Sequence, residues 1–212
     1  MEQRLDTKLQ NSLIHFNPYH IDRDIVPDYP STSDGYHVAI PSKLLFIHKG
    51  QDLILEMFKK YPIWAKRSIT FNFYGDGSDR STLETAFASE TMDKCILHGR
   101  VDDIAEIWRT NHALLMPSRM EGMPIMIISA MLSSRTCIAT DIGGHAEVIK
   151  SGQTGYIIPN PDVDALHETL ELAYKERRNW KDMGALCRQD ILNYLPEDPV
   201  SHFVDRLESL WA

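Results

Sequence analysis

The amino-acid sequence predicts an α/β protein built on a doubly wound parallel sheet of about six strands. From residue 36 onwards, short apolar segments alternate with segments whose apolar residues recur at helical spacing, and this order repeats about six times. Glycines and polar residues follow most of the apolar segments, as expected where strands end. The chain of 212 residues is long enough to bury a full core in one large domain, with or without an appendage.

Six apolar segments are the expected strands. They cover residues 36–40, 69–74, 95–98, 113–116, 136–140 and 155–158. Polar turns follow four of them, at residues 75–77, 99–101, 117–122 and 143–144. Right-handed crossovers place the carboxyl ends of parallel strands at one edge of the sheet, where ligands bind. These turns are therefore the first indication of a functional site.

The helices follow from apolar spacing and from their caps. The first carries Leu53, Ile54, Met57 and Phe58 at helical spacing. Ser78 or Asp79 is a suitable cap for the next helix, and Asp102 or Asp103 for the one after it. The later helices are expected near residues 146–149, 163–174, 177–193 and 200–211.

One further helix is expected to lie in the core. Residues 125–132 are apolar on nearly every side, and Pro124 suits the first helical position because its missing N–H is not needed there. Glu121 then lies at the mouth of a buried helix whose unpaired N–H groups are suited to a phosphate.

The first 35 residues do not share this pattern. They lack sustained periodicity and carry three prolines and one glycine, Pro18, Pro27, Pro30 and Gly35. We expect residues 1–35 to be an interdomain arm or linker, and residues 36–212 to be the folded domain with its C-terminal helices.

Composition excludes several classes of function. The net charge of -8 argues against nucleic acid as the main partner, because phosphate neutralisation needs a basic face. No apolar run approaches ~20 residues, and the amino end lacks the pattern of a signal peptide. Cys95, Cys137 and Cys187 lie in apolar contexts, which favours buried reduced thiols in a cytoplasmic protein. Metal-ligand spacings such as HExxH or CxxC are absent, so we expect no metal site.

Other nucleotide-binding signatures are weak. The only G-x-G, at residues 75–77, follows a later strand and has Arg80 where a third glycine would be needed. A Walker loop and a G-x-S-x-G elbow are both absent. A dinucleotide oxidoreductase is thus the less favoured class, although the predicted fold permits it.

Four segments resemble one family. LLFIHKGQD (residues 44–52), FYGDG (73–77), MPSRMEGMP (116–124) and DIGGHAE (141–147) are similar to motifs of the retaining GT-B glycosyltransferases of family 4, also called group 1. The resemblance covers roughly residues 15–211 in matching order. It implies the C-terminal, Rossmann-like half of a GT-B fold, which binds the sugar donor.

The resemblance implies two basic contacts with the donor diphosphate. Lys49 fills a lysine position of the family, where its ammonium is a point-charge partner for phosphate. Lys43 stands at an arginine position six residues earlier, so a bidentate fork is lost and the diphosphate is held less rigidly. Solvated surface charges are the alternative for both lysines.

The family's E-x7-E motif is only half present. Glu121 fills the first position, where the resemblance implies contact with the donor sugar or its developing charge, and we take it as the catalytic residue. Ser129 stands at the second position, where the family's carboxylate accepts bonds from the ribose. Losing a charged hydrogen bond costs about 1.5–3 kcal/mol, which predicts weaker nucleotide binding or a rearranged ribose contact. A small residue in a helical core is the alternative for Ser129.

Backbone groups complete the expected substrate site. Main-chain N–H groups at the helix start are expected to hold phosphate; they belong to Gly122, Met123 and Ile125. Arg100 and Val101 lie in a turn that resembles the family's base-contacting turn. Gly75 is either part of the phosphate-binding edge or a tight turn, and residues 143–144 either permit close approach of a ligand or only form a turn.

The implied activity is transfer of a sugar, with retention, from a nucleoside-diphosphate sugar and without a cofactor or metal. Lysines and a helix N-terminus take the place of a metal ion in stabilising the leaving diphosphate. The implied partner is an N-terminal acceptor-binding domain of the same full-length protein, so we expect the chain alone to be inactive. That domain would also supply any peripheral membrane contact. Family habit points to polysaccharide or lipopolysaccharide assembly. The alternative is a degenerate nucleotide-binding or structural domain.

Overall fold

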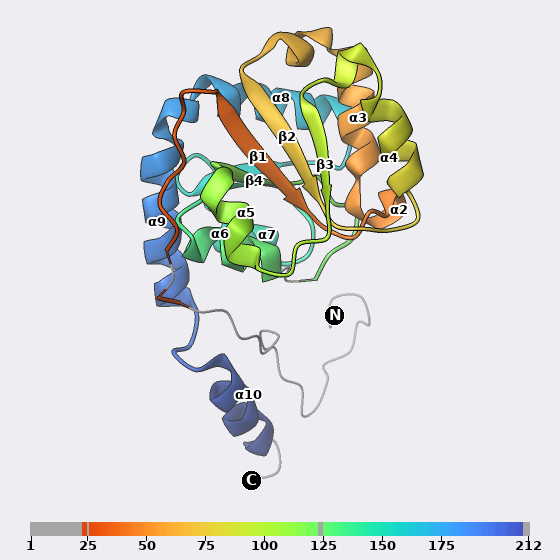
Figure 1. The fold of residues 1–212 in the computed structure, drawn as a ribbon. Helices are drawn as coiled ribbons and strands as arrows, with labels where there is room; N and C mark the ends of the chain where they lie inside the picture. The colour runs from red at the N-terminus through yellow and green to blue at the C-terminus, as the bar shows by residue number, and fades with distance from the viewer. Residues whose placement is uncertain (1–22, 25, 123–124, 210–212) are drawn as a thin grey trace. The chain divides into compact units, whose positions relative to one another are not determined.

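Figure 1 shows the computed structural model, which describes residues 23, 24, 26–122 and 125–209. The chain divides into two compact units. One is Arg23–Tyr194, which holds the sheet; the other joins the chain ends, and its described part is residues 195–209.

The sheet unit has the predicted parallel sheet of six strands. Its strands are β1 (Tyr36–Pro41), β2 (Ile69–Tyr74), β3 (Cys95–Gly99), β4 (Ala113–Met116), β5 (Thr136–Thr140) and β6 (Gly155–Ile158). Their order across the sheet is β3-β2-β1-β4-β5-β6, and every pair is parallel. This is the doubly wound order 3-2-1-4-5-6, and the fold prediction is confirmed.

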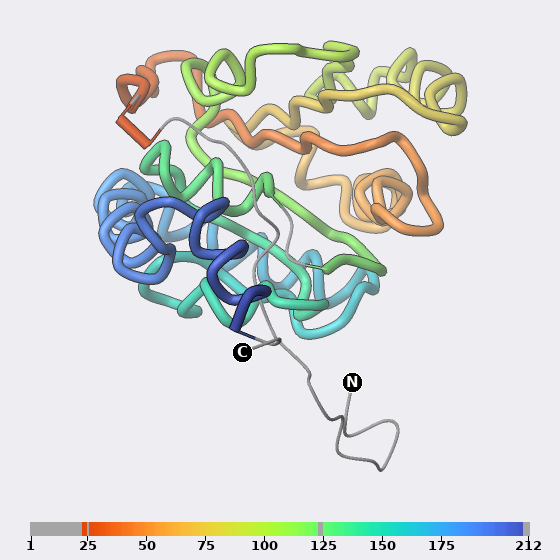
Figure 2. Tube along the Cα trace, turned by 90° about the horizontal axis from the view of Figure 1, so that it is seen from below, coloured from red at the N-terminus to blue at the C-terminus, as the bar shows by residue number. Residues whose placement is uncertain are grey.

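The strand order reverses between β1 and β4. Strand β1 pairs with β2 on one side and with β4 on the other, where Val38 lies opposite Ala113. In open α/β sheets such a switch point opens a crevice at the carboxyl ends of the strands. Figure 2 shows the consequence for the sheet unit, since the segments up to β3 and those after β4 occupy different halves.

Helices cover both faces of the sheet. They are α2 (Phe46–Lys49), α3 (Gln51–Lys60), α4 (Arg80–Phe87), α5 (Ile104–Thr110), α6 (Ile125–Leu132), α7 (His145–Val148), α8 (Val163–Lys175) and α9 (Trp180–Tyr194). Helix α3 packs beside α8, and α6 packs beside α9. Right-handed crossovers that run in opposite directions from the switch point place α3 and α6 on opposite faces.

The described helices differ from the prediction in small ways. Three short 3-10 helices were not predicted, at Pro62–Lys66, Glu90–Met92 and Arg177–Asn179, because three to five residues leave no periodic pattern. The last of them replaces the predicted first turn of α9. Helix α7 begins one residue earlier than predicted and ends one residue earlier.

One predicted cap serves a different helix. Asp79 precedes α4, but its side chain makes no capping bond there. Its carboxylate accepts a hydrogen bond from the backbone N–H of Phe46, at 2.7 Å, and so caps α2 instead. Asp103 caps α5 as predicted, because its carboxylate accepts from the N–H of Ala105 at 2.9 Å.

Helix α6 is a core helix, as predicted. Its last six residues are buried, and only the first, Ile125, is strongly exposed. The three cysteines are also buried and unpaired, as expected of reduced thiols.

The described part of the expected arm packs on the sheet unit through a buried arginine. Arg135 is 1% exposed, and its guanidinium donates to backbone carbonyls of six residues: Pro27, Asp28, Trp108, Asn111, Ser133 and Ser134. Burial lowers the pKa of Arg135 to about 10. Residues 27 and 28 are thus held to the sheet unit by one side chain, while residues 1–22 of the arm lie outside the described residues.

Buried histidines and amides form a polar network near α5. The Asn72 amide donates to Asn111 at 2.9 Å, and the Asn111 amide donates to the Tyr74 hydroxyl at 2.8 Å. The backbone N–H of His37 donates to Nδ1 of His112 at 2.9 Å. Burial lowers the pKa of both histidines, and that of His112 falls to about 4. The network therefore needs neutral imidazoles.

The second unit contains one described helix, α10 (Pro199–Glu208). Asp198 caps it by accepting from the N–H groups of Val200 and Ser201, at 3.0 and 3.1 Å. The helix was predicted to reach residue 211, and residues 210–212 lie outside the described residues. Within the described ranges, no helix has the length and apolar character needed to cross a bilayer.

Replacing Arg135 tests the role of its guanidinium. We expect Arg135→Lys to lower the free energy of unfolding by about 2–3 kcal/mol. A lysine ammonium cannot donate to all of these carbonyls at once, so several charged hydrogen bonds are lost. Urea denaturation measures the change. The control Arg109→Lys, at a half-exposed ion pair with Asp103, should change stability by less than about 0.5 kcal/mol. Equal losses in the two variants would contradict the assignment.

The buried histidines predict acid sensitivity. The pKa of His112 is about 4 in the folded chain and ~6.5 when unfolded, so its stabilising contribution is complete above pH ~6.5 and is lost as the pH falls toward 4. The loss attributable to this ring is roughly 2–3 kcal/mol. Urea unfolding over this pH window should show a steeper decline for the wild type than for His112→Gln, which cannot be protonated. Parallel curves would refute the prediction.

Candidate functional site

The loops at the carboxyl edge of the sheet touch backbone to backbone. Gly50 has φ of 66°, and a Cβ there would lie 2.0 Å from the carbonyl oxygen of Pro117. Gly143 has φ of 61°, and a Cβ there would lie 2.4 Å from the carbonyl oxygen of Gly122. Side chains fit neither position. The loop at residues 117–122 is therefore clamped between the loop after β1 and the loop after β5.

Lys49 and Glu121 form an ion pair in this clamp. The Lys49 ammonium lies 2.5 Å from Oε1 of Glu121, and the side chains are 23% and 9% exposed. The Ser118 hydroxyl donates to the same carboxylate oxygen at 3.0 Å. The structure therefore brings together the predicted diphosphate lysine, at the end of α2, and the predicted catalytic carboxylate, 72 residues later in the chain.

A second ion pair sets the position of this loop. The Arg119 guanidinium donates to both carboxylate oxygens of Asp52, at 2.6 and 2.8 Å, and to the carbonyl of Phe46 at 2.7 Å. The backbone N–H groups of Arg119 and Met120 both donate to the carbonyl of His48, at 2.8 and 3.1 Å. Sequence reasoning missed this pair, because an arginine and an aspartate so far apart in the chain give no local signal.

Lys43 is anchored through its backbone. The buried Gln51 amide donates to the Lys43 carbonyl and to the Ser42 hydroxyl, both at 2.9 Å. The Lys43 side chain itself is exposed. Its position at the edge is thus defined, while its ammonium stays available to a ligand.

A cavity of about 280 Å³ lies beside these loops. Four of the predicted substrate residues line it: Lys43, Gly75, Arg100 and Val101. Its apolar wall comes from Ile104 and Ile107 of α5 and from Met126 of α6. Apolar walls with a few polar groups at the rim are typical of ligand sites.

Gly75 has a structural role in this cavity. Its φ is 128°, and a Cβ there would lie 2.1 Å from the carbonyl oxygen of Ser42. The glycine therefore lets the turn after β2 approach the end of β1 closely. A contact with phosphate stays a prediction.

Ser129 lies apart from the cavity lining. It is 2% exposed, and its hydroxyl accepts a hydrogen bond from Nε1 of the buried Trp108, at 2.8 Å. A buried indole N–H needs such an acceptor. This partner was not apparent from the sequence, and the expected ribose contact stays a prediction.

The expected phosphate-binding N–H groups are partly described. Gly122 ends the loop and is exposed, and a Cβ there would meet nothing within 4 Å. Ile125 begins α6 and is 40% exposed. Met123 lies outside the described residues.

His145 is a buried residue that sequence reasoning did not assign to the site. Its Nδ1 lies 2.7 Å from the carbonyl oxygen of Thr140 and must donate, since a carbonyl only accepts. Nε2 is buried and has no hydrogen-bond partner among the described residues. Burial is the main cause that lowers the pKa of His145. The buried Nε2 without a partner is what draws attention to His145, and it is visible only in the structure.

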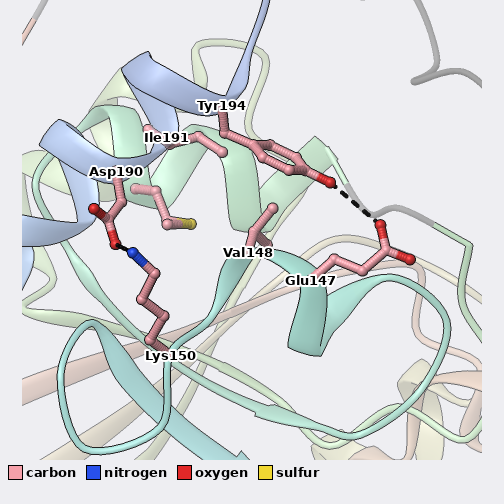
Figure 3. A pocket seen from close by; sticks show the side chains of 7 residues that line it. Glu147, Val148, Lys150, Asp190, Ile191 and Tyr194 are labelled. Carbon is pink, nitrogen blue, oxygen red and sulfur yellow. Dashed lines mark hydrogen bonds and ion pairs between the residues drawn. The ribbon is translucent and has the colours of Figure 1, made fainter.

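A second, smaller cavity is not a candidate nucleotide site. It measures about 70 Å³ and lies between α6, α7 and α9 (Figure 3). Lys150 pairs with Asp190 at 2.6 Å, and the Tyr194 hydroxyl donates to Glu147 at 3.2 Å. This cavity is too small for a nucleotide. Among the described residues, no cluster of three or more histidine, cysteine or acidic side chains is arranged to hold a metal ion.

Curated relatives are similar to this chain over part of their length. An uncharacterized glycosyltransferase of Methanocaldococcus jannaschii is 31% identical over 185 residues, which are 83% of this chain and 48% of that protein. The Escherichia coli UDP-Gal:alpha-D-GlcNAc-diphosphoundecaprenol alpha-1,3-galactosyltransferase is 26% identical over 125 residues, which are 58% of this chain and 32% of that protein. The chain thus spans about a third to a half of these relatives.

Solved structures show the same fold. A mutant of TarM from S. aureus, in complex with fondaparinux, alpha-GlcNAc-glycerol and UDP, matches with a TM-score of 0.80 at 19% identity. The match covers 98% of this chain and 42% of that chain. At this identity the likeness establishes the fold alone.

The family follows from a direct match. The model of the glycosyl transferases group 1 matches residues 29–189, which are most of the chain and include every loop of the carboxyl edge. The chain therefore belongs to the glycosyl transferases of group 1 and carries a sheet domain of their GT-B fold.

Proposed function

We propose that this chain binds a nucleoside-diphosphate sugar and forms the donor-binding half of a retaining glycosyltransferase of family 4. The observation that carries the proposal is the Lys49–Glu121 ion pair, which couples a cation suited to diphosphate with a carboxylate suited to a sugar. The cavity lined by Lys43 and Arg100 lies at the same edge and has room for the nucleoside end.

The donor diphosphate is held by charge and by backbone donors. Lys49 supplies one positive charge, and the exposed Lys43 ammonium supplies a second. The N–H groups around Gly122 and Ile125 stand at the N-terminus of α6, whose dipole favours anions. In this proposal these groups also stabilise the leaving diphosphate, and no metal ion takes part.

Glu121 acts on the sugar. In the structure its carboxylate is held by Lys49 and Ser118. A diphosphate that attracts Lys49 releases this carboxylate toward the sugar, where its negative charge stabilises the positive charge that develops in the transition state. Binding of the leaving diphosphate therefore also frees the Glu121 carboxylate to act on the sugar.

The acceptor is bound by another part of the protein. This chain spans less than half of these two relatives, and the family resemblance implies an acceptor-binding domain that faces the donor-binding domain across a cleft. The name of the E. coli relative specifies an acceptor linked to diphosphoundecaprenol. By analogy, we propose polysaccharide assembly on the cytoplasmic face of a membrane, reached through the acceptor-binding half.

A degenerate nucleotide-binding domain without transferase activity is the second candidate. Two observations favour it. Lys43 replaces the arginine that the family resemblance leads us to expect, and the Ser129 hydroxyl oxygen accepts a hydrogen bond from the indole of Trp108. Both weaken the expected grip on a nucleotide.

A nucleotide panel tests donor binding. UDP, GDP, ADP and CMP are titrated into the chain, and thermal unfolding is followed; at 100-fold excess over Kd the binding nucleotide should stabilise the fold by about 2.7 kcal/mol. Lys49→Met should weaken binding of that nucleotide at least about tenfold, because a charged contact with phosphate is lost. The control Lys60→Met removes a more exposed lysine that pairs with Asp164, and should leave binding unchanged. No shift with any nucleotide would refute donor binding.

Replacing Glu121 separates binding from turnover. We expect Glu121→Gln to bind nucleotide as well as the wild type or more tightly, because Lys49 no longer has a carboxylate partner. In the full-length protein the same variant should lose at least about a hundredfold in sugar transfer, measured with labelled donor. The matched control is Glu147→Gln, whose carboxylate accepts from Tyr194. Undiminished transfer by Glu121→Gln would exclude the catalytic role.

A further inference from the structure

His145 is buried at the start of α7 with half of its ring unsatisfied. It has no exposed surface, and Nδ1–H donates to the Thr140 carbonyl at 2.7 Å. This bond fixes the neutral tautomer in which Nε2 carries a lone pair. Nε2 lacks a hydrogen-bond partner in the described part of the chain. A buried polar atom in this state costs free energy, so it needs an explanation.

The ring is connected to the loop that carries Glu121. The Thr140 hydroxyl donates to the Ser118 carbonyl at 2.6 Å. The backbone N–H of Gly144, the residue before His145, donates to the Gly122 carbonyl at 3.2 Å. His145 is therefore tied to both ends of the segment that holds the catalytic carboxylate.

The ion pair of the site acts on the same ring. Burial lowers the pKa of His145, and the hydrogen bond to the Thr140 carbonyl raises it. The Glu121 carboxylate also raises this pKa, the Lys49 ammonium lowers it, and Asp141 on the adjoining loop raises it. Helix α6 carries no titratable side chain. On α7 and α9, Glu147 and Asp190 already pair with Tyr194 and Lys150 (Figure 3).

Donor binding is expected to change the charges that act on His145. In the structure Lys49 pairs with Glu121, whose side chain is only 9% exposed. When the diphosphate attracts Lys49, a nearly buried carboxylate loses its counter-charge, and such a state is strongly unfavourable unless another cation replaces it. Arg119 is already engaged by Asp52. His145 is the buried base on which both charges act.

We propose that His145 takes up one proton from solvent when the donor diphosphate draws Lys49 away from Glu121, and that the resulting imidazolium becomes the counter-charge of this carboxylate. The proton binds at Nε2, while Nδ1–H keeps its bond to Thr140, and the proton returns to solvent when the nucleotide leaves. His145 is thus a positioning residue that acts through Glu121. The inference rests on the proposed function, because it requires a diphosphate at Lys49.

The coupled proton makes nucleotide affinity depend on pH. Proton uptake on binding means that affinity for the nucleotide rises as the pH falls through the pKa of the bound state. With one coupled proton the dissociation constant changes by up to about tenfold per pH unit within the window between the pKa values of the free and bound states. Protonation of the nucleotide's own terminal phosphate, with a pKa of ~6, acts in the opposite direction and is the same for every variant.

The experiment is calorimetric titration of the chain with the nucleoside diphosphate that gives the largest thermal shift. Titrations at about pH 6.5 are run in two buffers with different protonation enthalpies, so that the difference in heat counts the protons taken up. The wild type should take up a substantial fraction of one proton more than His145→Gln, which has no titratable ring. His167→Gln is the matched control, because burial also lowers the pKa of that ring but it lies against Tyr61 and Trp64 instead.

The results of this titration distinguish failure of the inference from failure of the proposed function. Proton uptake in the wild type and in His167→Gln, with less uptake in a folded His145→Gln, supports the inference. Binding by the wild type with no difference between the buffers, or with the same difference in His145→Gln, overturns it whether or not the variant is fully stable. Absence of binding heat with all nucleotides overturns the proposed function itself.

Discussion

The ion pair between Lys49 and Glu121 depends on loops that are forced into contact. Gly50 and Gly143 admit the loop at residues 117–122 only because they lack side chains. Arg119 then locks that loop to Asp52 at the start of α3. The site is thus created by the switch point of the sheet, where the segment after β1 meets the segment after β4. Neither segment alone places a cation against a carboxylate.

Much of this framework was predictable from the sequence, for a physical reason. The strands are short apolar runs bounded by glycine or polar residues, so their limits agree with the prediction to within one residue. Burial of α6 followed from its composition in the same way. Local patterns did not predict the short 3-10 helices, or the cap that Asp79 provides to a helix more than thirty residues earlier. Arg135 was missed because its partners are backbone carbonyls, which leave no mark in the sequence.

In the candidate site too, residues in local motifs were predictable from the sequence, and contacts between distant residues were not. Lys49 and Glu121 were identified from motifs, and the structure places them 2.5 Å apart. Their supporting contacts were not predicted: Arg119 with Asp52, Gln51 with Lys43, and His145 with Thr140. Each joins residues by geometry rather than by a pattern of neighbouring residue types. Sequence motifs thus nominated these two residues, whose roles stay predictions, while the contacts that hold them became visible only in the fold.

The contact between Trp108 and Ser129 shows how one side chain constrains the rest of the site. The indole is fully buried, so its N–H requires an acceptor, and a serine hydroxyl on α6 supplies it at 2.8 Å. A glutamate at position 129 would bring a negative charge into a position that is only 2% exposed. With serine there, α6 contributes packing and its N-terminus, and no carboxylate. In the proposed function the positive charges that bind the ligand therefore lie on the segment after β1, at Lys43 and Lys49. Gln51 holds the backbone of Lys43, and Asp52 holds Arg119 of the facing loop.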